Sequence, residues 1–127
     1  MTLNEILIRY SSIVKLSEKK LPIKLSYALL KNIFKLRNES EIIDDNRIKL
    51  AEIYAEKNDD GSPKTKDGNF IIENEEQFHK EFDDYCQTEI EVDICKCKRS
   101  EFDKLEEPRY DALSSSEILS LEFMIED

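Results

Sequence analysis

Residues Leu21–Tyr54 read LPIKLSYALLKNIFKLRNESEIIDDNRIKLAEIY, and this stretch decides the fold. It contains no glycine, and its only proline, Pro22, comes second, in the first helical turn, where a missing amide hydrogen costs nothing. Apolar residues recur along it at three- and four-residue spacing, which is typical of an amphipathic helix. The sequence therefore predicts a long helix over about 22–57.

The first half of this helix carries two neighbouring apolar stripes. On a helical wheel they are Ile23, Tyr27, Leu30 and Phe34 in one stripe, and Leu25, Leu29, Ile33 and Leu36 in the other. Together they make more than half of the circumference apolar, so we expect the central helix of the core. Lys24, Lys31 and Lys35 then occupy the narrow outward face. The polar residues at 38–45 are compatible with one long helix or with two shorter ones, and they favour a break between two helices.

Shorter elements flank this helix on both sides. Before it we expect a helix at about 2–16. After it we expect a small β-hairpin at about 62–72, a helix at about 74–87 and a C-terminal helix at about 114–125. The hairpin is indicated by two turn sequences, Asp59–Pro63 and Asp67–Asn69. Asn74 is suited to cap the helix that follows it. Ser114 and Glu117 match the capping box of a last helix.

The segment 88–98 alternates between apolar and polar residues. Ile90, Val92 and Ile94 fall on one face, and Glu89, Glu91, Asp93, Cys95 and Cys97 fall on the other. This alternation predicts a half-buried strand. The expected architecture is a single domain over 1–127 of the α+β class, mostly helical, in which a helical core with long N-terminal helices carries a small β element and a C-terminal helix.

Charge is distributed unevenly along the 127 residues. The formal net charge is -10, but residues 1–57 hold 11 basic and 8 acidic side chains, whereas residues 58–127 hold 8 basic and 21 acidic ones. Between Glu73 and Asp93 there are nine acids and a single base, Lys80. The molecule is therefore bipolar along its sequence.

The cellular location follows from what the sequence lacks. No apolar run approaches the ~20 residues that cross a bilayer, and the N-terminus MTLNEILIRY has neither the basic start nor the continuous apolar run of a secretory signal. The three cysteines are an odd number in a chain large enough to fold without disulfides, which favours reduced thiols. We expect a cytoplasmic protein that makes no contact with a membrane.

Catalytic and metal-binding motifs are scarce. His79, the only histidine, lies seven residues before Cys86, and a zinc site with Cys95 and Cys97 is conceivable, but the C-x-C spacing favours free thiols. There is no G-x-S-x-G motif, no glycine-rich phosphate loop and only one histidine to serve as a base. The sequence therefore predicts no enzyme activity, no catalytic residue, no metal and no cofactor.

The acids of the second half are the candidate binding residues. We expect them to form one negative face on the helix 74–87 and the following strand, opposed by the lysine face of the long helix. The predicted partner-binding residues are Glu75, Glu76, Asp83, Asp84, Glu89, Glu91 and Asp93. Direct binding of nucleic acid is not expected, because the net charge repels phosphate and no aromatic stacking platform accompanies the lysines.

Four segments resemble a family of small phage and prophage proteins of Gram-positive bacteria. They are LPIKLSYALLKNI (Leu21–Ile33), YAEKNDDGSPK (Tyr54–Lys64), FHKEFDDYCQTEIEVDI (Phe78–Ile94) and LSSSEILSLEFMIED (Leu113–Asp127). These segments cover under half of the chain and contain structural rather than catalytic positions. The segment Arg99–Ala112 departs from the pattern.

The resemblance implies a phage-encoded protein that acts in the cytoplasm of a bacterial host. It implies a non-enzymatic acidic inhibitor, similar in kind to anti-CRISPR proteins, that occupies the basic nucleic-acid-binding surface of a host defence protein. The alternative is a virion or tail-assembly component that works by self-association, in which the acidic end of one copy packs against the basic end of another. A homodimer is compatible with the inhibitor function.

Overall fold

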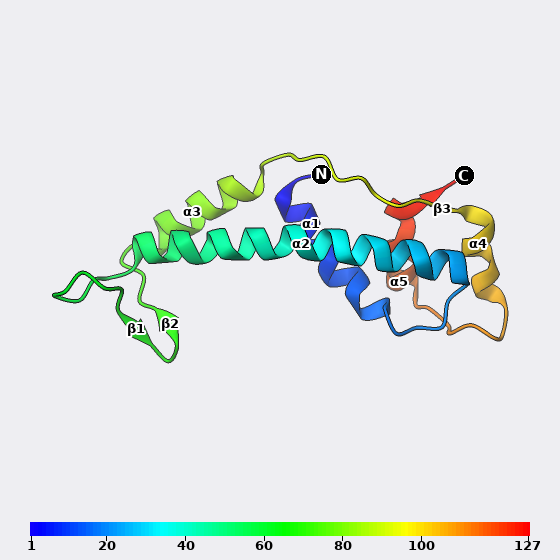
Figure 1. The fold of residues 1–127 in the computed structure, drawn as a ribbon, viewed down its shortest axis with the longest axis horizontal. Coiled ribbons are helices and arrows are strands. Elements are labelled where there is room, and N and C mark those ends of the chain that lie inside the picture. Colours follow the sequence, from blue (N-terminus) through cyan, green and yellow to red (C-terminus); the bar gives the residue numbers. More distant parts are fainter.

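A single long helix organises the fold. The computed structural model describes all 127 residues, Met1–Asp127, and its helix α2 spans Ile23–Tyr54 without interruption (Figure 1). Its 32 residues make it about 48 Å long at 1.5 Å per residue. The predicted break near residues 38–45 is wrong, because those polar side chains are mostly exposed to water and no glycine or proline lies within the helix. The helix ends at Tyr54 because Ala55 is extended and pairs with Ile72.

Two further helices complete the packed part of the molecule. Helix α1 (Leu3–Ile13) packs against α2, and α5 (Ser115–Leu121) packs against α1. Each continues into a short 3₁₀ turn, and each lies within the range predicted for it. Ser114 and Glu117 form the predicted capping box of α5: the hydroxyl accepts from the Glu117 amide at 3.2 Å, and the carboxylate accepts from the Ser114 amide at 2.9 Å.

Only one of the two predicted stripes of α2 is in the core. Leu25, Leu29, Ile33 and Leu36 are at most 1% exposed and pack with α1, α5 and the C-terminal residues. The neighbouring stripe is the opposite: Ile23 is 80%, Tyr27 61%, Leu30 37% and Phe34 60% exposed. Helix α1 packs on the buried stripe, whereas Ile23 and Tyr27 border only a shallow depression that they share with residues 95–98 and Glu101. Helix α2 is therefore a one-sided support rather than a helix surrounded by core.

The core contains one polar side chain, Asn32, which is fully buried. Its side-chain oxygen accepts from the backbone amide of Cys95 at 2.7 Å, and its side-chain nitrogen donates to the Cys95 carbonyl at 2.9 Å. The nitrogen also lies 3.6 Å from the Met124 sulfur. These bonds satisfy the buried amide, and they attach a segment 63 residues away to the N-terminal half of α2.

The predicted strand at 88–98 is mostly wrong. Residues 88–96 are extended, but apart from one bridge between Thr2 and Glu89 they have no strand partner. Only β3 (Cys97–Lys98) enters a sheet, where it pairs in parallel with β4 (Ile125–Glu126). The backbone of the segment is instead satisfied by side chains of α2 and by the N-terminus. Half-burial of Ile90, Val92 and Ile94 against the core explains the alternation without a ladder.

A β-hairpin occupies the end of the molecule beyond the C-terminus of α2 (Figure 1). Strands β1 (Thr65–Lys66) and β2 (Asn69–Phe70) are antiparallel and joined by Asp67 and Gly68, both with positive φ. Two positive φ angles are the requirement of a type I′ hairpin turn, which explains the Asp-Gly pair. The hairpin lies inside the predicted range 62–72.

The remaining helices connect the hairpin to the C-terminal part. Helix α3 (Glu75–Cys86) begins after its cap Asn74 and lies along the C-terminal half of α2, and α4 (Arg99–Asp103) with a 3₁₀ turn at Lys104–Glu106 follows β3. The predicted class, α+β and mostly helical, is confirmed. None of the helices combines the length and apolar character needed to cross a membrane.

Replacing Asn32 tests how far the fold depends on its amide. In Asn32→Ala the amide and carbonyl of Cys95 lose their partner in a largely water-excluded place, so we expect the free energy of unfolding to fall by about 2–3 kcal/mol. Urea denaturation of the purified protein measures it. The control is Asn4→Ala, an exposed asparagine on α1, which should change stability by less than about 0.5 kcal/mol. Equal losses in the two variants would contradict the role assigned to Asn32.

Candidate functional site

The acids of α3 are held outward by an aromatic face. Phe78 stacks with Phe82 at 6.5 Å between ring centroids, Phe82 contacts Tyr85 at 6.1 Å, and Tyr54 at the end of α2 meets Phe78 edge-on at 6.1 Å. The Tyr85 hydroxyl accepts from Asn46 of α2 at 3.0 Å. Because this face lies against α2, the predicted binding residues of α3 are all exposed: Glu75, Glu76, Asp83 and Asp84.

The side chains of the extended segment are set by its two anchors. At one end the amino group of Met1 donates to the Ile90 carbonyl and to the Glu89 carboxylate, both at 3.0 Å, and the Ile90 amide donates to the Met1 carbonyl. At the other end Lys35 donates to the Asp93 carbonyl at 2.6 Å. Between these anchors Glu89, Glu91 and Asp93 point to solvent, as predicted from the alternation.

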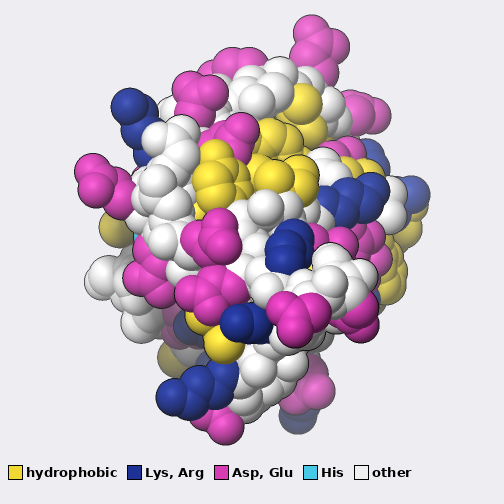
Figure 2. All heavy atoms as spheres, turned by 90° about the vertical axis from the view of Figure 1, so that its left-hand side faces the viewer, with side chains coloured by type: hydrophobic (Ala, Val, Ile, Leu, Met, Phe, Trp, Pro, Cys, Tyr) yellow, Lys and Arg dark blue, Asp and Glu magenta, His cyan; other side chains and the backbone are white.

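The seven predicted residues follow a line rather than forming a compact cluster. Helix α3 lies along the C-terminal half of α2, and the extended segment continues along its N-terminal half (Figure 1). The twelve residues of α3 alone span about 18 Å. At the hairpin end, acidic side chains surround a hydrophobic patch with lysines or arginines among them (Figure 2). The expectation of one dense face is therefore replaced by an acidic run along one side of α2.

Two carboxylates of the acidic run have cationic partners. Glu89 pairs with the Met1 amino group at 3.0 Å, and the Asp93 carboxylate lies 3.8 Å from Lys35. The other five make no ion pair. Glu75 and Glu76 occupy the first turn of α3, where the helix dipole favours negative charge, so these two also have a structural role.

The predicted lysine face does not oppose the acidic run as a separate surface. Lys35 reaches the extended segment and joins the two, whereas Lys24 and Lys31 are exposed. The prediction that no aromatic side chains accompany these lysines is also wrong. Lys31 lies over the exposed ring of Tyr27 at 5.8 Å, and Arg37 lies over that of Phe34 at 5.6 Å.

Sequence reasoning missed the exposure of one stripe of α2 and the burial of Asn32. The exposed stripe of α2 was assigned to the core, although a 127-residue chain has little material to cover both sides of a helix this long. Asn32 was not singled out, although it is the one polar residue inside the stripe between Leu25 and Leu36. That interruption of an apolar face is the signal that points to a buried hydrogen bond.

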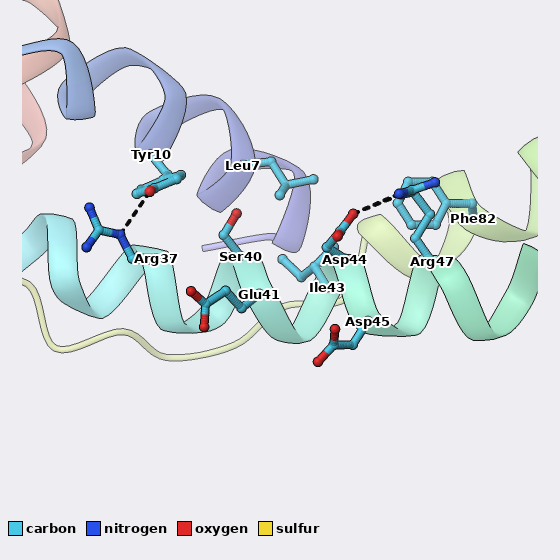
Figure 3. A pocket seen from close by; sticks show the side chains of 10 residues that line it. All are labelled: Leu7, Tyr10, Arg37, Ser40, Glu41, Ile43, Asp44, Asp45, Arg47 and Phe82. Atoms are coloured by element: carbon cyan, nitrogen blue, oxygen red, sulfur yellow. Dashed lines mark hydrogen bonds and ion pairs between the residues drawn. The ribbon is translucent and has the colours of Figure 1, made fainter. Parts of the chain in front are cut away.

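A groove of about 540 Å³ lies between α1 and α2 (Figure 3). Arg37 donates to the Tyr10 hydroxyl at 3.0 Å, which raises the pKa of Arg37, and Arg47 pairs with Asp44 at 3.0 Å. Arg47 and Asp44 therefore neutralise each other, whereas Arg37 is bonded to a neutral hydroxyl. Ser40 and the carboxylates of Glu41 and Asp45 also line the groove.

The cysteines and the histidine are not gathered into a metal site. His79 contacts the Phe78 ring at 5.3 Å, and no group of three or more metal-binding side chains is close enough to hold an ion. All three cysteines are free. Burial raises the pKa of the Cys86 and Cys97 thiols, and nearby carboxylates add to the effect, with Asp83 acting on Cys86 and Glu101 on Cys97.

Thiol labelling checks this description. A raised pKa and burial both lower the thiolate fraction that reacts, so in the native protein at pH 8 we expect Cys86 and Cys97 to react at least about tenfold more slowly with a disulfide reagent than in urea. Mass spectrometry after labelling identifies the sites. The half-buried Cys95 serves as the internal comparison, and rapid native labelling of Cys86 would contradict its burial.

Comparisons with known proteins were made with the whole chain. No model of a known protein family, no curated protein and no solved structure matches it. The function is therefore inferred from the residues and contacts described above.

Proposed function

We propose that this chain is a non-enzymatic binding protein, encoded by a phage or prophage, that inhibits a nucleic-acid-dependent host defence protein by occupying its basic surface. The phage origin rests on the resemblance of the four sequence segments. The mode of action is supported by one observation: the acidic run on α3 and the extended segment faces solvent, and five of its seven carboxylates lack a cationic partner.

Unpaired exposed carboxylates act at a distance. Their field steers a basic partner toward the acidic run and raises the rate of association, an effect that falls as salt increases. The same field repels nucleic acid, so a chain seated on a basic groove competes with phosphate for the same lysines and arginines. An acidic run extending along α3 and the segment after it also suits a groove that normally holds an extended polyanion.

The acidic run is attached firmly to the rest of the fold. Asn32 and Lys35 bind the backbone of the extended segment, and the Met1 amino group fixes its beginning. The aromatic face of α3 packs on α2. Carboxylates held on anchored elements lose little conformational entropy when a partner binds, which favours affinity.

Charge reversal in the acidic run tests the proposal. Glu89 and Asp93 take part in anchoring the segment, so the variant uses only unpaired acids: Asp83→Lys, Asp84→Lys and Glu91→Lys together. We expect binding of the host partner at low salt to weaken by more than about tenfold. The matched control changes the net charge equally at exposed, unpaired acids elsewhere, Asp59→Lys, Asp103→Lys and Glu106→Lys.

The partner is obtained by affinity purification from a lysate of a Gram-positive host at two salt concentrations. We expect a nucleic-acid-binding protein that is retained better at low salt, and whose bound labelled DNA or RNA the chain displaces in a fluorescence anisotropy titration. Recovery of phage structural proteins alone would support the assembly reading instead. Equal binding by the acidic-run variant and its control would show that the chosen surface is wrong.

A further inference from the structure

The exposed stripe of α2 has the spacing of a helix-pairing seam. Ile23, Tyr27, Leu30 and Phe34 are separated by four, three and four residues, which is the alternation of the a and d positions in a coiled coil. The next apolar residue at this spacing is Ile48, which is also exposed. The positions between Phe34 and Ile48 are polar (Arg37, Glu41 and Asp44) and border the groove between α1 and α2. In Figure 1 this helix crosses in front of α1 and α5, and no element of the chain covers its outer side.

Charges beside the seam are arranged with opposite signs in the two halves of α2. At seven-residue intervals along one flank lie Lys24, Lys31, Asn38, Asp45 and Glu52, all exposed. In an antiparallel pair of α2 helices related by a twofold axis near Asn38, each lysine faces an acid of the other copy. A parallel pair would place Lys31 beside Lys31 and Asp45 beside Asp45, which is repulsive.

We propose that α2 is a self-recognition surface through which two copies of this chain pair in antiparallel orientation about an axis near Asn38. In this register Lys31 faces Asp45 of the second copy, and Lys24 faces Glu52. At the seam Leu30 packs on Ile48 of the second copy. Arg37 faces Glu41 near the axis, and Asp44, the third polar residue at the seam positions, faces Phe34 of the second copy.

The extent of the contact fits a reversible dimer. A helix about 48 Å long and ~10 Å wide covers on the order of 500 Å² per copy, or about 1,000 Å² in total, which is near the lower limit of specific interfaces. Burying the exposed side chains of Tyr27 and Phe34 supplies apolar area that the monomer leaves in water. We therefore expect a dimer whose population rises with protein concentration.

The charges of the face favour a second copy over nucleic acid. Tyr27 and Phe34 with their neighbouring cations offer stacking surfaces for bases. However, Glu41, Asp45 and Glu52 continue the same face, and a polyanion laid along α2 would meet them. Only a surface that is acidic at one end and basic at the other matches the whole helix, and the chain itself has that pattern.

Charge reversal and its symmetric rescue test the register. We expect sedimentation equilibrium of the full chain to show a monomer–dimer equilibrium. Lys31→Glu should raise the dissociation constant by about tenfold, because each reversal occurs twice in the dimer. Asp45→Lys should do the same, and the double variant should restore the dissociation constant to near that of the unmodified chain. Monomer at every concentration of the unmodified chain, or a double variant no better than the singles, would overturn the proposal.

Cross-linking tests the axis independently of these charges. In Asn38→Cys the introduced thiol lies near its symmetry mate, so mild oxidation should produce a covalent dimer much faster than in Lys66→Cys, an exposed position on the hairpin. Both variants keep the three native cysteines, whose contribution is measured with the unmodified chain. Equal cross-linking of the two variants would exclude an antiparallel axis near Asn38. Retention of labelled single-stranded DNA by the monomer would show that the face binds nucleic acid instead.

Discussion

The amide of Asn32 holding the backbone of Cys95 is the interaction on which the arrangement of the second half depends. It is the only fully buried polar side chain, and both of its hydrogen-bonding groups are directed to one residue of a segment whose other backbone bonds go to the N-terminal residues and to Lys35. An amide that pairs with both the N–H and the C=O of one residue imitates a neighbouring strand. The extended segment is thereby fixed in register on α2, so that Ile90, Val92 and Ile94 face the core and the acids between them face water.

This one-sided attachment explains why α2 is left open on its outer face. The buried stripe of α2 packs against α1, α5 and the C-terminal residues. The extended segment and α3 are bound beside this stripe, along the helix. The chain has no further element to place over Tyr27 and Phe34. Leaving such side chains in water costs hydrophobic stabilisation that a partner restores, which is why exposed apolar stripes on small proteins indicate contact surfaces.

Local patterns in the sequence predicted the elements that depend on local physics. The Asp67-Gly68 turn, the Asn74 cap and the Ser114–Glu117 capping box are each satisfied by residues within a few positions, and the structure contains them where they were expected. The uninterrupted course of α2 was missed because polar residues were read as a break, although none of them prevents a helix. The exposure of the acids was predictable from alternation alone.

What could not be predicted depends on contacts between distant residues. Periodicity identifies two apolar stripes on α2 but does not show which one is buried. The buried stripe is the one that packs against Leu121 and Met124, more than 80 residues away in the sequence. Alternation predicts the half-burial of 89–94 correctly, but it is wrong for Cys97, which was expected on the face of the acids and is buried. A strand also requires a partner strand, and Asn32 takes that place. The pairing of Glu89 with Met1 and of Asp93 with Lys35 likewise joins residues 88 and 58 positions apart.

The two surfaces face different directions on the same helix, and this has a consequence for function. The acidic run lies on elements packed along one side of α2, whereas the seam is the side that they leave uncovered. Pairing through the seam would therefore leave both acidic runs accessible, and each dimer would offer two copies of the charged surface to a partner. An antiparallel twofold contact is also closed, because each copy uses its seam completely in binding the other. Self-association of this kind ends at two copies, so it agrees with the proposed inhibitor rather than with the open-ended growth that a tail or shell component requires.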